Sequence, residues 1–474
     1  MFNLNLKNLL ALVILVASTY SPVFAQSTQV PTTRTEIQLS FAPLVKQVTP
    51  SVVNVYAARR AVQTSPFAGD PFFERFFGGR GFGRPRDQNS LGSGVIVDPS
   101  GIIITNHHVI KGADDVKIAL SDGREFEAEI ILKDEASDLA VLKVIEDVEF
   151  IAIEIGNSED ALVGDLVLAI GNPFGVGQTV TSGIISAVAR SANGIGDFGF
   201  FIQTDAAINP GNSGGALIDM KGRLIGVNTA IFSKSGGSNG IGFAIPSNMV
   251  NVAIQSSEIG NTLRRPWIGA SFQDLTAEIA QSLGLDRPRG ALVTGVSKGG
   301  PADKAGIKAG DIIVAVNDIR IQHTNALGYR LTTVGIDNLA KLEILSKGEK
   351  KQAELELMAA PETIPANQTE MPQRSALGGS LMANLSPAIA QKIKLASDKE
   401  GVVVLSVQRG SPAAKNRIRP GDILREINGE KITRVSDIEP LISERRKRWV
   451  FVVERQGREY VMDRNGGSFR QYTR

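Results

Sequence analysis

Between residues 92 and 250 the chain is a succession of short segments rich in valine and isoleucine. This feature limits the possible folds of the chain more than any other in the sequence. Segments such as "SGVIVD", "GIIITN" and "DLVLAIGNP" are bounded by glycine, asparagine, aspartate or proline. In "VKIAL", Val116, Ile118 and Leu120 alternate with the other residues, which is the period of a half-buried strand. No long segment with helical periodicity lies between them. We therefore predict a mainly β fold whose sheets close into barrels, not a doubly wound α/β layer.

The C-terminal half contains an internal repeat. Residues 290–321 align without gaps on residues 401–432 at a constant offset of 111, and 13 of the 32 aligned positions are identical. The identical positions include Pro301/Pro412, Gly310/Gly421, Asp311/Asp422 and Asn317/Asn428. The repeat predicts two copies of one α/β module, at 264–358 and 376–466.

The segments before each repeat also match, at 275–285 and 385–395. There Thr276 and Ser386 are expected to cap helix N-termini, with Pro387 at the first helical position. Between the two modules, residues 359–375 contain three prolines and are expected to form a linker.

The first 25 residues have the pattern of a secretory signal. Lys7 precedes the apolar run "LLALVILVA", and the small residues that follow place Val23 and Ala25 at the −3 and −1 positions of a cleavage site after Ala25. An uncleaved membrane anchor is the alternative. This apolar run is much shorter than the roughly 20 residues of a membrane-spanning helix, which favours export and cleavage without a stable membrane span. Residues 26–256 would then form the β-rich domain.

Composition excludes several classes of chemistry. The chain has no cysteine, so thiol nucleophiles, thiolate metal sites and disulfides are absent, and we predict no metal and no cofactor. The formal net charge of +2 gives no general reason to expect nucleic acid as a partner. Residues 59–90 are rich in phenylalanine, glycine and arginine. The motif "GGRGFGR" there is short and isolated for a nucleic-acid-binding segment, so we interpret 59–90 as a mobile surface loop that docks on a neighbouring subunit.

The stretch "NPGNSGGAL" at 209–217 surrounds one hydroxyl, Ser213, with three glycines and no charge. A tight turn would explain one or two of these glycines. Alternatively, the backbone N–H groups of Gly211, Asn212 and Ser213 converge on an oxyanion beside a nucleophilic serine.

A nucleophilic serine needs a base and a carboxylate that orients the base. His107 and His108 end an apolar strand, whereas the third histidine, His323, lies in the repeated module and is expected at the surface. Asp138 directly precedes the apolar run "LAVLKV", where it could meet an imidazole or simply initiate a strand. The order His108, Asp138, Ser213 is that of chymotrypsin-type β-barrels. In the rival α/β-hydrolase elbow, which "GNSGG" also matches, the serine comes first and a helix follows it, but here a strand-like run follows Ser213.

The motifs "TNHHVI", "SDLAVLKV", "GNPFG", "TDAAINPGNSGGAL" and "GIGFAIPSN" resemble the HtrA (Deg) family of serine endoproteases with two PDZ domains, of the periplasmic DegP/DegQ type. The resemblance runs from "FAPLVKQVTPSVVNV" through most of the chain. It implies a chymotrypsin-like double β-barrel with His108 as base, Asp138 as orienting acid and Ser213 as nucleophile. Members commonly carry asparagine where this chain has His107. The choice of His108 over His107 as the base therefore rests on the family motif.

The resemblance also implies further site residues. Ile208 and Ile231 would form a small apolar S1 pocket, which implies cleavage after valine or alanine, and Arg190 would open the activation loop. The carboxylate-binding loop of the first PDZ domain would comprise Arg265, Trp267, Ile268 and Gly269. Pro266 within that loop lacks an N–H donor.

The function implied is ATP-independent digestion of unfolded or damaged proteins in the periplasm, as part of protein quality control and the stress response. Unfolded polypeptides and exposed peptide C-termini would be captured by the PDZ domains, and the chain would form homotrimers and larger cages. The alternative is a chaperone or peptide-binding scaffold in which proteolysis is secondary.

Overall fold

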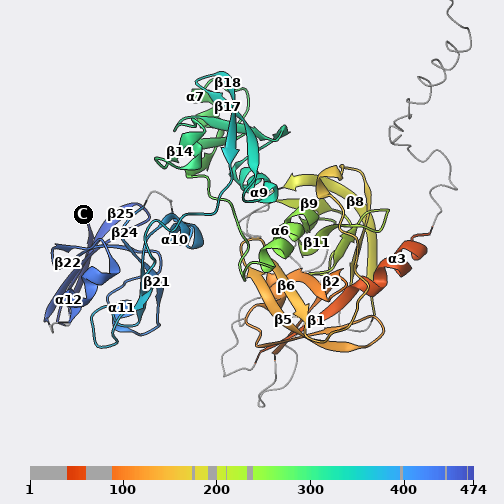
Figure 1. The fold of residues 1–474 in the computed structure, drawn as a ribbon, viewed down its shortest axis with the longest axis horizontal. Coiled ribbons are helices and arrows are strands. Elements are labelled where there is room, and N and C mark those ends of the chain that lie inside the picture. The colour runs from red at the N-terminus through yellow and green to blue at the C-terminus, as the bar shows by residue number, and fades with distance from the viewer. Residues whose placement is uncertain are drawn as a thin grey trace, which may run out of the picture. The chain divides into compact units, whose positions relative to one another are not determined.

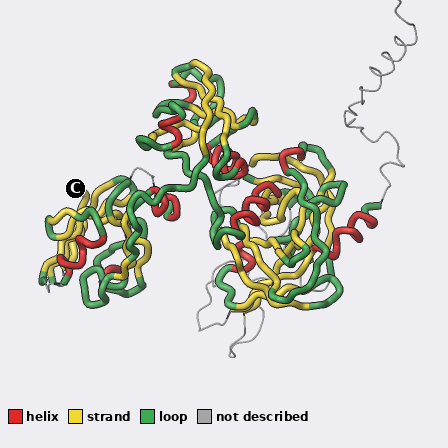
Figure 2. The backbone as a smooth tube through the Cα atoms, in the orientation of Figure 1, coloured by secondary structure: helices red, strands yellow, loops and turns green. Residues whose placement is uncertain are grey.

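The structure is a computed structural model that describes residues 40–59, 88–172, 177–190, 200–209, 211–231, 239–395, 399–443, 446–466 and 468–474. The signal sequence at 1–25 and most of the phenylalanine-rich loop at 59–90 therefore lie outside the described residues. The helix α3 (Ala42–Val48) and the 3-10 turn η1 (Thr49–Ser51) precede the first strand. In Figure 2 the strands are much more extensive than the helices, which are short.

The β-rich domain consists of two closed barrels of six strands each, which confirms the predicted fold class (Figure 1). The first barrel has the order β1-β2-β3-β6-β5-β4 and the second the order β10-β11-β12-β9-β8-β7. The strands of the first are β1 (Val52–Arg59), β2 (Gln88–Asp98), β3 (Ile102–Asn106), β4 (Asp115–Ala119), β5 (Glu125–Asp134) and β6 (Leu139–Val144). Those of the second are β7 (Leu166–Gly171), β8 (Thr179–Arg190), β9 (Phe201–Thr204), β10 (Ala216–Ile218), β11 (Leu224–Ile231) and β12 (Gly242–Pro246).

The period-two pattern determines which side chains fill each barrel. In β4, Val116 and Ile118 are buried while Asp115 and Lys117 are exposed, as the alternation predicts. Each fully buried valine, leucine or isoleucine stabilises the fold by about 1.5–3 kcal/mol relative to an exposed one. Helices are short here: α5 (His107–Ile110) follows β3, η2 (Ser158–Asp160) precedes β7, and α6 (Ser247–Ser257) follows β12.

The two repeats fold into two sheets, and the elements from β14 to β16 recur as β21 to β23 at the offset of 111. The first sheet comprises β13 (Ala270–Asp274), β14 (Ala291–Val296), β15 (Ile312–Val316), β16 (Ile319–Arg320), β17 (Leu339–Ser346) and β18 (Glu349–Glu356), with helices α7 (Ala277–Ser282), α8 (Pro301–Lys304) and α9 (Thr324–Val334). The second comprises β19 (Thr369–Glu370), β20 (Ser380–Asn384), β21 (Val402–Val407), β22 (Ile423–Ile427), β23 (Glu430–Lys431), β24 (Arg448–Arg455), β25 (Arg458–Asn465) and β26 (Ser468–Thr473). Its helices are α10 (Pro387–Lys392), α11 (Pro412–Lys415), η4 (Val435–Asp437) and α12 (Ile438–Ile442).

The second sheet extends beyond the expected range 376–466 at both ends. β19 lies in the segment expected as a linker, and β26 pairs with β25 near the C-terminus. A two-residue strand such as β19 has too little sequence for a periodic pattern. β26 has only Phe469 and Tyr472 as large apolar residues, so its pairing is not evident from the sequence.

Identical positions of the repeat have identical hydrogen-bonding roles. Asn317 and Asn428 both have positive φ, at 48° and 52°. Their Oδ1 atoms accept the N–H groups of Lys341 and Val450, each at 2.9 Å. The predicted caps are also confirmed, because the Thr276 and Ser386 side chains accept the N–H groups of the residues three positions further on.

We predict that Asn428→Ala destabilises the second module by about 2 kcal/mol, because alanine tolerates positive φ poorly and lacks the hydrogen bond. Asn428→Gly should cost about half as much, because glycine removes only the hydrogen bond and keeps the backbone conformation accessible. Hydrogen exchange of β22 and β24 amides in the full chain measures both losses. Equal protection in the two variants would contradict the assigned role.

Candidate active site

Ser213 follows a tight turn at residues 209–212. The Asn212 N–H donates to the Asn209 carbonyl at 3.0 Å, and Gly211 has a φ of 97°. A type II turn has positive φ at its third position, which favours glycine there, and commonly has proline at its second position. The sequence Asn-Pro-Gly-Asn satisfies both requirements.

The glycines after Ser213 allow backbones to approach closely. Gly214 has a φ of 83°, and a Cβ atom on it would lie 2.0 Å from the Ser93 carbonyl oxygen. A Cβ atom on Gly215 would lie 2.2 Å from the Ile170 carbonyl oxygen. The bare backbone of "NPGNSGGAL" therefore serves two purposes: Gly211 forms the turn, and Gly214 and Gly215 bring Ser213 against strands of both barrels.

His108 and Asp138 form a direct pair within the first barrel. The imidazole Nδ1 lies 2.7 Å from Asp138 Oδ2, and the His108 backbone N–H donates to Asp138 Oδ1 at 3.0 Å. His108 is the second residue of α5, which follows β3, and Asp138 directly precedes β6, which pairs with β3. Asp138 has a φ of 57°, an unfavourable conformation for a non-glycine residue that costs about 1–3 kcal/mol.

Asp138 stays ionised although it is largely buried, with 14% of its side chain exposed. Burial raises the pKa of Asp138, but the hydrogen bond and charge of the His108 ring, the Thr229 hydroxyl and the His108 N–H outweigh it and bring the pKa below its usual value.

Thr229 of β11 connects Asp138 to Ser213, and no local sequence pattern indicates this role. Its Oγ1 donates to Asp138 Oδ2 at 2.6 Å, and its carbonyl accepts the Ser213 hydroxyl at 3.2 Å. Ser213 and Asp138 are thus both hydrogen-bonded to Thr229, Ser213 to its carbonyl and Asp138 to its side chain. No hydrogen bond joins His108 and Ser213, since the described contact of the Ser213 hydroxyl is with Thr229.

The other two histidines occupy different positions. His107 is half-buried, and its backbone N–H donates to the Asp138 carbonyl at 3.0 Å, while its ring is not bonded to the Asp138 carboxylate. Burial lowers the pKa of His107, against the charge of Asp138, which raises it. His323 was expected at the surface. It is instead half-buried at the N-terminus of α9, where its Nδ1 accepts the Ala326 N–H at 3.2 Å.

The residues expected at the S1 pocket lie beside one glycine of the second barrel. Ile208 is 1% exposed, and a Cβ atom on Gly242 would lie 2.7 Å from its Cδ1. Ile231 ends β11 and pairs with Gly242. Arg190 ends β8 and pairs with Phe201, and the segment that follows it lies outside the described residues.

The expected carboxylate-binding loop borders a cavity of about 280 Å³, which is lined mostly by the first repeat module and also by Gln391 and Leu395 of the second. Trp267 and Ile268 line it together with Phe272 of β13 and Leu327 and Leu331 of α9. Gly269 has a φ of 66°, and its neighbour Ile268 is buried. The Arg265 guanidinium is paired with Asp134, at 2.5 Å between Nη2 and Oδ2, so it is not free to bind a carboxylate in this conformation.

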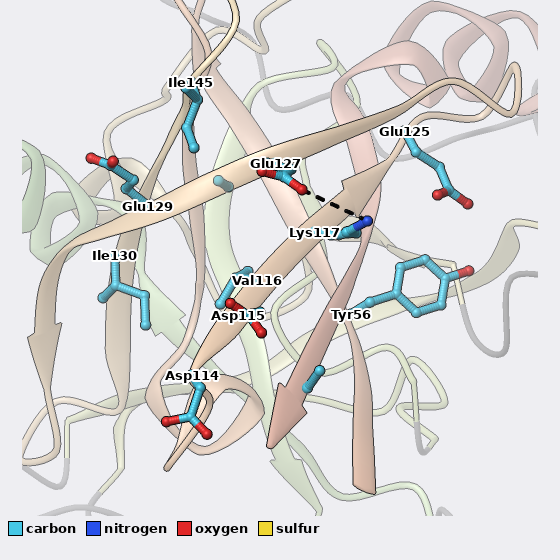
Figure 3. A pocket seen from close by; sticks show the side chains of 12 residues that line it. Tyr56, Asp114, Asp115, Val116, Lys117, Glu125, Glu127, Glu129, Ile130 and Ile145 are labelled. Carbon is cyan, nitrogen blue, oxygen red and sulfur yellow. Dashed lines mark ion pairs between the residues drawn. The ribbon is translucent and has the colours of Figure 1, made fainter. Parts of the chain in front are cut away.

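A different hollow, of about 850 Å³, lies on the first barrel and has no catalytic constellation (Figure 3). Solvent-facing carboxylates of β4 and β5 line it, and Lys117 Nζ lies 3.8 Å from Glu127 Oε1. None of His108, Asp138 and Ser213 borders this hollow. Its size therefore does not mark it as the reaction centre.

These features define the class of protein: a trypsin-like serine peptidase with two PDZ domains. A trypsin-like peptidase domain model matches residues 92–227, and PDZ domain models match residues 292–331 and 387–458. The Escherichia coli K12 periplasmic serine endoprotease DegP is 36% identical over 457 residues, covering 91% of this chain and 93% of DegP. A Haemophilus influenzae protein named probable periplasmic serine protease do/HhoA-like is 39% identical over 420 residues, covering 85% and 87%.

Solved structures agree with these relatives. The HtrA-type protease AlgW with a decapeptide is 42% identical, with a TM-score of 0.51, over 68% of this chain and 99% of that one. The chain belongs to the HtrA (Deg) family and is a serine endopeptidase. Among the described residues, no helix combines the length and apolar character needed to cross a membrane.

We predict that Thr229→Val lowers kcat about 10-fold or more, because a hydrogen bond to a charged group contributes about 1.5–3 kcal/mol. Valine keeps the shape but removes the donor to Asp138. Thr204→Val is the matched control, since Thr204 is also buried and donates to the Ile184 carbonyl at 2.8 Å. Hydrolysis of a short peptide by both variants decides the matter: equal kcat values would contradict a role for the Thr229 hydroxyl in the reaction.

Proposed function

We propose that this chain is an ATP-independent endopeptidase that digests unfolded or damaged proteins, with Ser213 as nucleophile, His108 as general base and Asp138 as the acid that orients the base. The pairing of the His108 Nδ1 with the largely buried Asp138 carboxylate carries this assignment. A carboxylate at Nδ1 holds the proton there and leaves Nε2 unprotonated to accept the serine proton. Catalytic hydrogen bonds are often absent or long without substrate, so the Ser213 contact with Thr229 is compatible with a later contact with His108.

The N–H groups of Gly211 and Ser213 are the proposed donors to the oxyanion of the tetrahedral intermediate. Neither donates a hydrogen bond to another described residue, whereas the N–H of Asn212, the third candidate, donates to the Asn209 carbonyl. The positive φ of Gly211 sets the direction of the first donor. Each oxyanion donor typically contributes about 10²–10³ in rate.

Substrate selection would act at two places. Buried Ile208 beside Gly242, with Ile231, suits a small apolar side chain such as valine or alanine before the cleaved bond. Activation would involve the segment that Arg190 opens. At the first PDZ domain, a peptide C-terminus would add as a strand between β13 and α9 and occupy the cavity lined by Ile268 and Leu327.

The setting we propose follows the relatives, which are named periplasmic proteases. Export by the N-terminal 25 residues would place this chain in the periplasm, where homotrimers and larger cages would act in stress response and quality control. A second candidate function, a chaperone or peptide-binding scaffold with proteolysis secondary, is supported by the two PDZ domains.

We predict that Ser213→Ala abolishes casein digestion, with a loss of several orders of magnitude in kcat, while binding of unfolded protein persists. His108→Ala should have a comparable loss. His107→Ala, the matched control, should retain most of the activity, because only the His108 ring contacts Asp138. Casein cleavage by Ser213→Ala would refute the assigned nucleophile. Digestion by wild type too weak to affect unfolded substrates, with intact suppression of their aggregation, would favour the chaperone function.

We also predict that quenched peptides differing only in the residue before the cleaved bond are cut at least 10-fold faster with valine or alanine there than with phenylalanine or lysine. Each methylene group that a small apolar pocket cannot accommodate costs about 1–3 kcal/mol. The ratio of kcat/KM values measures this selectivity. A preference for lysine would show that Ile208 and Ile231 do not form the specificity pocket.

A further inference from the structure

Ser93 of the first barrel is fully buried, and its polar groups reach the turn that carries Ser213. Its hydroxyl donates to the Gly211 carbonyl at 2.5 Å and accepts the Asn172 N–H at 2.8 Å. Its backbone N–H donates to the Ser213 carbonyl at 2.8 Å. One side chain of the first barrel therefore connects the nucleophile turn to the end of β7 in the second barrel.

These contacts fix the peptide group between Gly211 and Asn212. Its carbonyl is held by the Ser93 hydroxyl and its N–H by the Asn209 carbonyl. With both polar groups held, the plane of this peptide cannot rotate freely. Gly211 is the residue that would otherwise permit rotation, since glycine adopts positive and negative φ with similar ease.

The neighbouring side chain gives the turn no comparable support. Asn212 is fully buried, yet neither its Oδ1 nor its Nδ2 has a hydrogen-bond partner among the described residues. The Gly214 N–H holds the chain after Ser213 by donating to the Asn228 carbonyl, on the other side of the nucleophile. Ser93 is thus the side-chain anchor of the peptide that lies between the two proposed oxyanion donors, the N–H groups of Gly211 and Ser213.

We propose that Ser93 is a positioning residue, whose hydroxyl holds the peptide between Gly211 and Asn212 and thereby keeps the N–H groups of Gly211 and Ser213 in the relative position that binds the oxyanion. This inference rests on the proposed oxyanion role of Gly211. Without the hydroxyl, the Gly211 carbonyl and the Asn172 N–H both lose a buried partner, and the turn is free to rotate its donor away. The loss falls on the transition state, because the substrate carbonyl demands less from this donor than the oxyanion does.

The test is Ser93→Ala in the full-length protein. We expect kcat for a short peptide to fall about 10- to 100-fold, less than or similar to the loss of a direct donor, with KM changed less than twofold. Affinity for a peptide aldehyde, which forms a tetrahedral adduct with Ser213, should fall by a similar factor. Affinity for the uncleaved peptide, compared between Ser213→Ala and the Ser93→Ala/Ser213→Ala double variant, should stay unchanged.

Ser247→Ala is the control that distinguishes an effect on the nucleophile turn from a general loss of stability. Ser247 is equally buried, and its hydroxyl donates to the Gly156 carbonyl at 2.6 Å, so its loss should lower the melting temperature and leave kcat and aldehyde affinity intact. If Ser93→Ala does not fold, Ser93→Cys offers a side chain of similar size with a weak donor. A folded Ser93 variant with wild-type kcat and aldehyde affinity would overturn the inference, whereas cleavage by Ser213→Ala would instead overturn the proposed function.

Discussion

The approach of Gly214 to Ser93 is the constraint on which the active site depends. Because a Cβ atom at position 214 would lie 2.0 Å from the Ser93 carbonyl oxygen, the two barrels meet here backbone to backbone. This contact brings the turn of Ser213 against the barrel that carries His108 and Asp138. Each barrel alone has a complete strand order and its own apolar interior, but neither contains all three groups. The site therefore forms only at the seam between them.

The negative charge of the Asp138 carboxylate at this seam is stabilised mainly by protein hydrogen-bond donors, because the side chain is largely buried. Burial would favour the protonated form of Asp138, and the His108 ring, the His108 N–H and the Thr229 hydroxyl reverse that tendency. Since the folded-state pKa of Asp138 is lowered, its pairing stabilises the fold above the usual aspartate pKa, and this stabilisation is lost as pH falls through the folded-state value. The same donors thus keep Asp138 charged for its proposed role and stabilise the seam at pH values above the usual aspartate pKa.

Sequence patterns predicted the features that recur along the chain, but not the hydrogen bonds between residues far apart in the sequence. The alternation in "VKIAL" predicted a barrel strand, and the offset of 111 placed β14 and β21, and β15 and β22, at equivalent positions. The pairing of His108 with Asp138 agrees with the motif-based choice between the two histidines. Thr229 and Ser93 were not identified, because a hydroxyl that bonds to a group far along the chain has no local periodicity or spacing. His323 was misplaced because helix capping by imidazole is uncommon, and Arg434, the residue at the offset of 111, gave no hint of it.

We expect the repeat modules to tolerate amino-acid substitutions better than the seam between the barrels, because their binding geometry is less demanding. In the PDZ modules, Asn317 and Asn428 perform the same backbone bond in two copies that share only 13 of 32 residues over the repeat. Strand addition needs a sheet edge and an apolar cavity, which many sequences supply. At the seam, the hydroxyls of Ser93, Thr229 and Ser213 each donate to one acceptor at a defined distance. Misplacement by about 1 Å can cost 10²-fold in rate, so we expect a substitution that breaks one of these bonds to lower the rate.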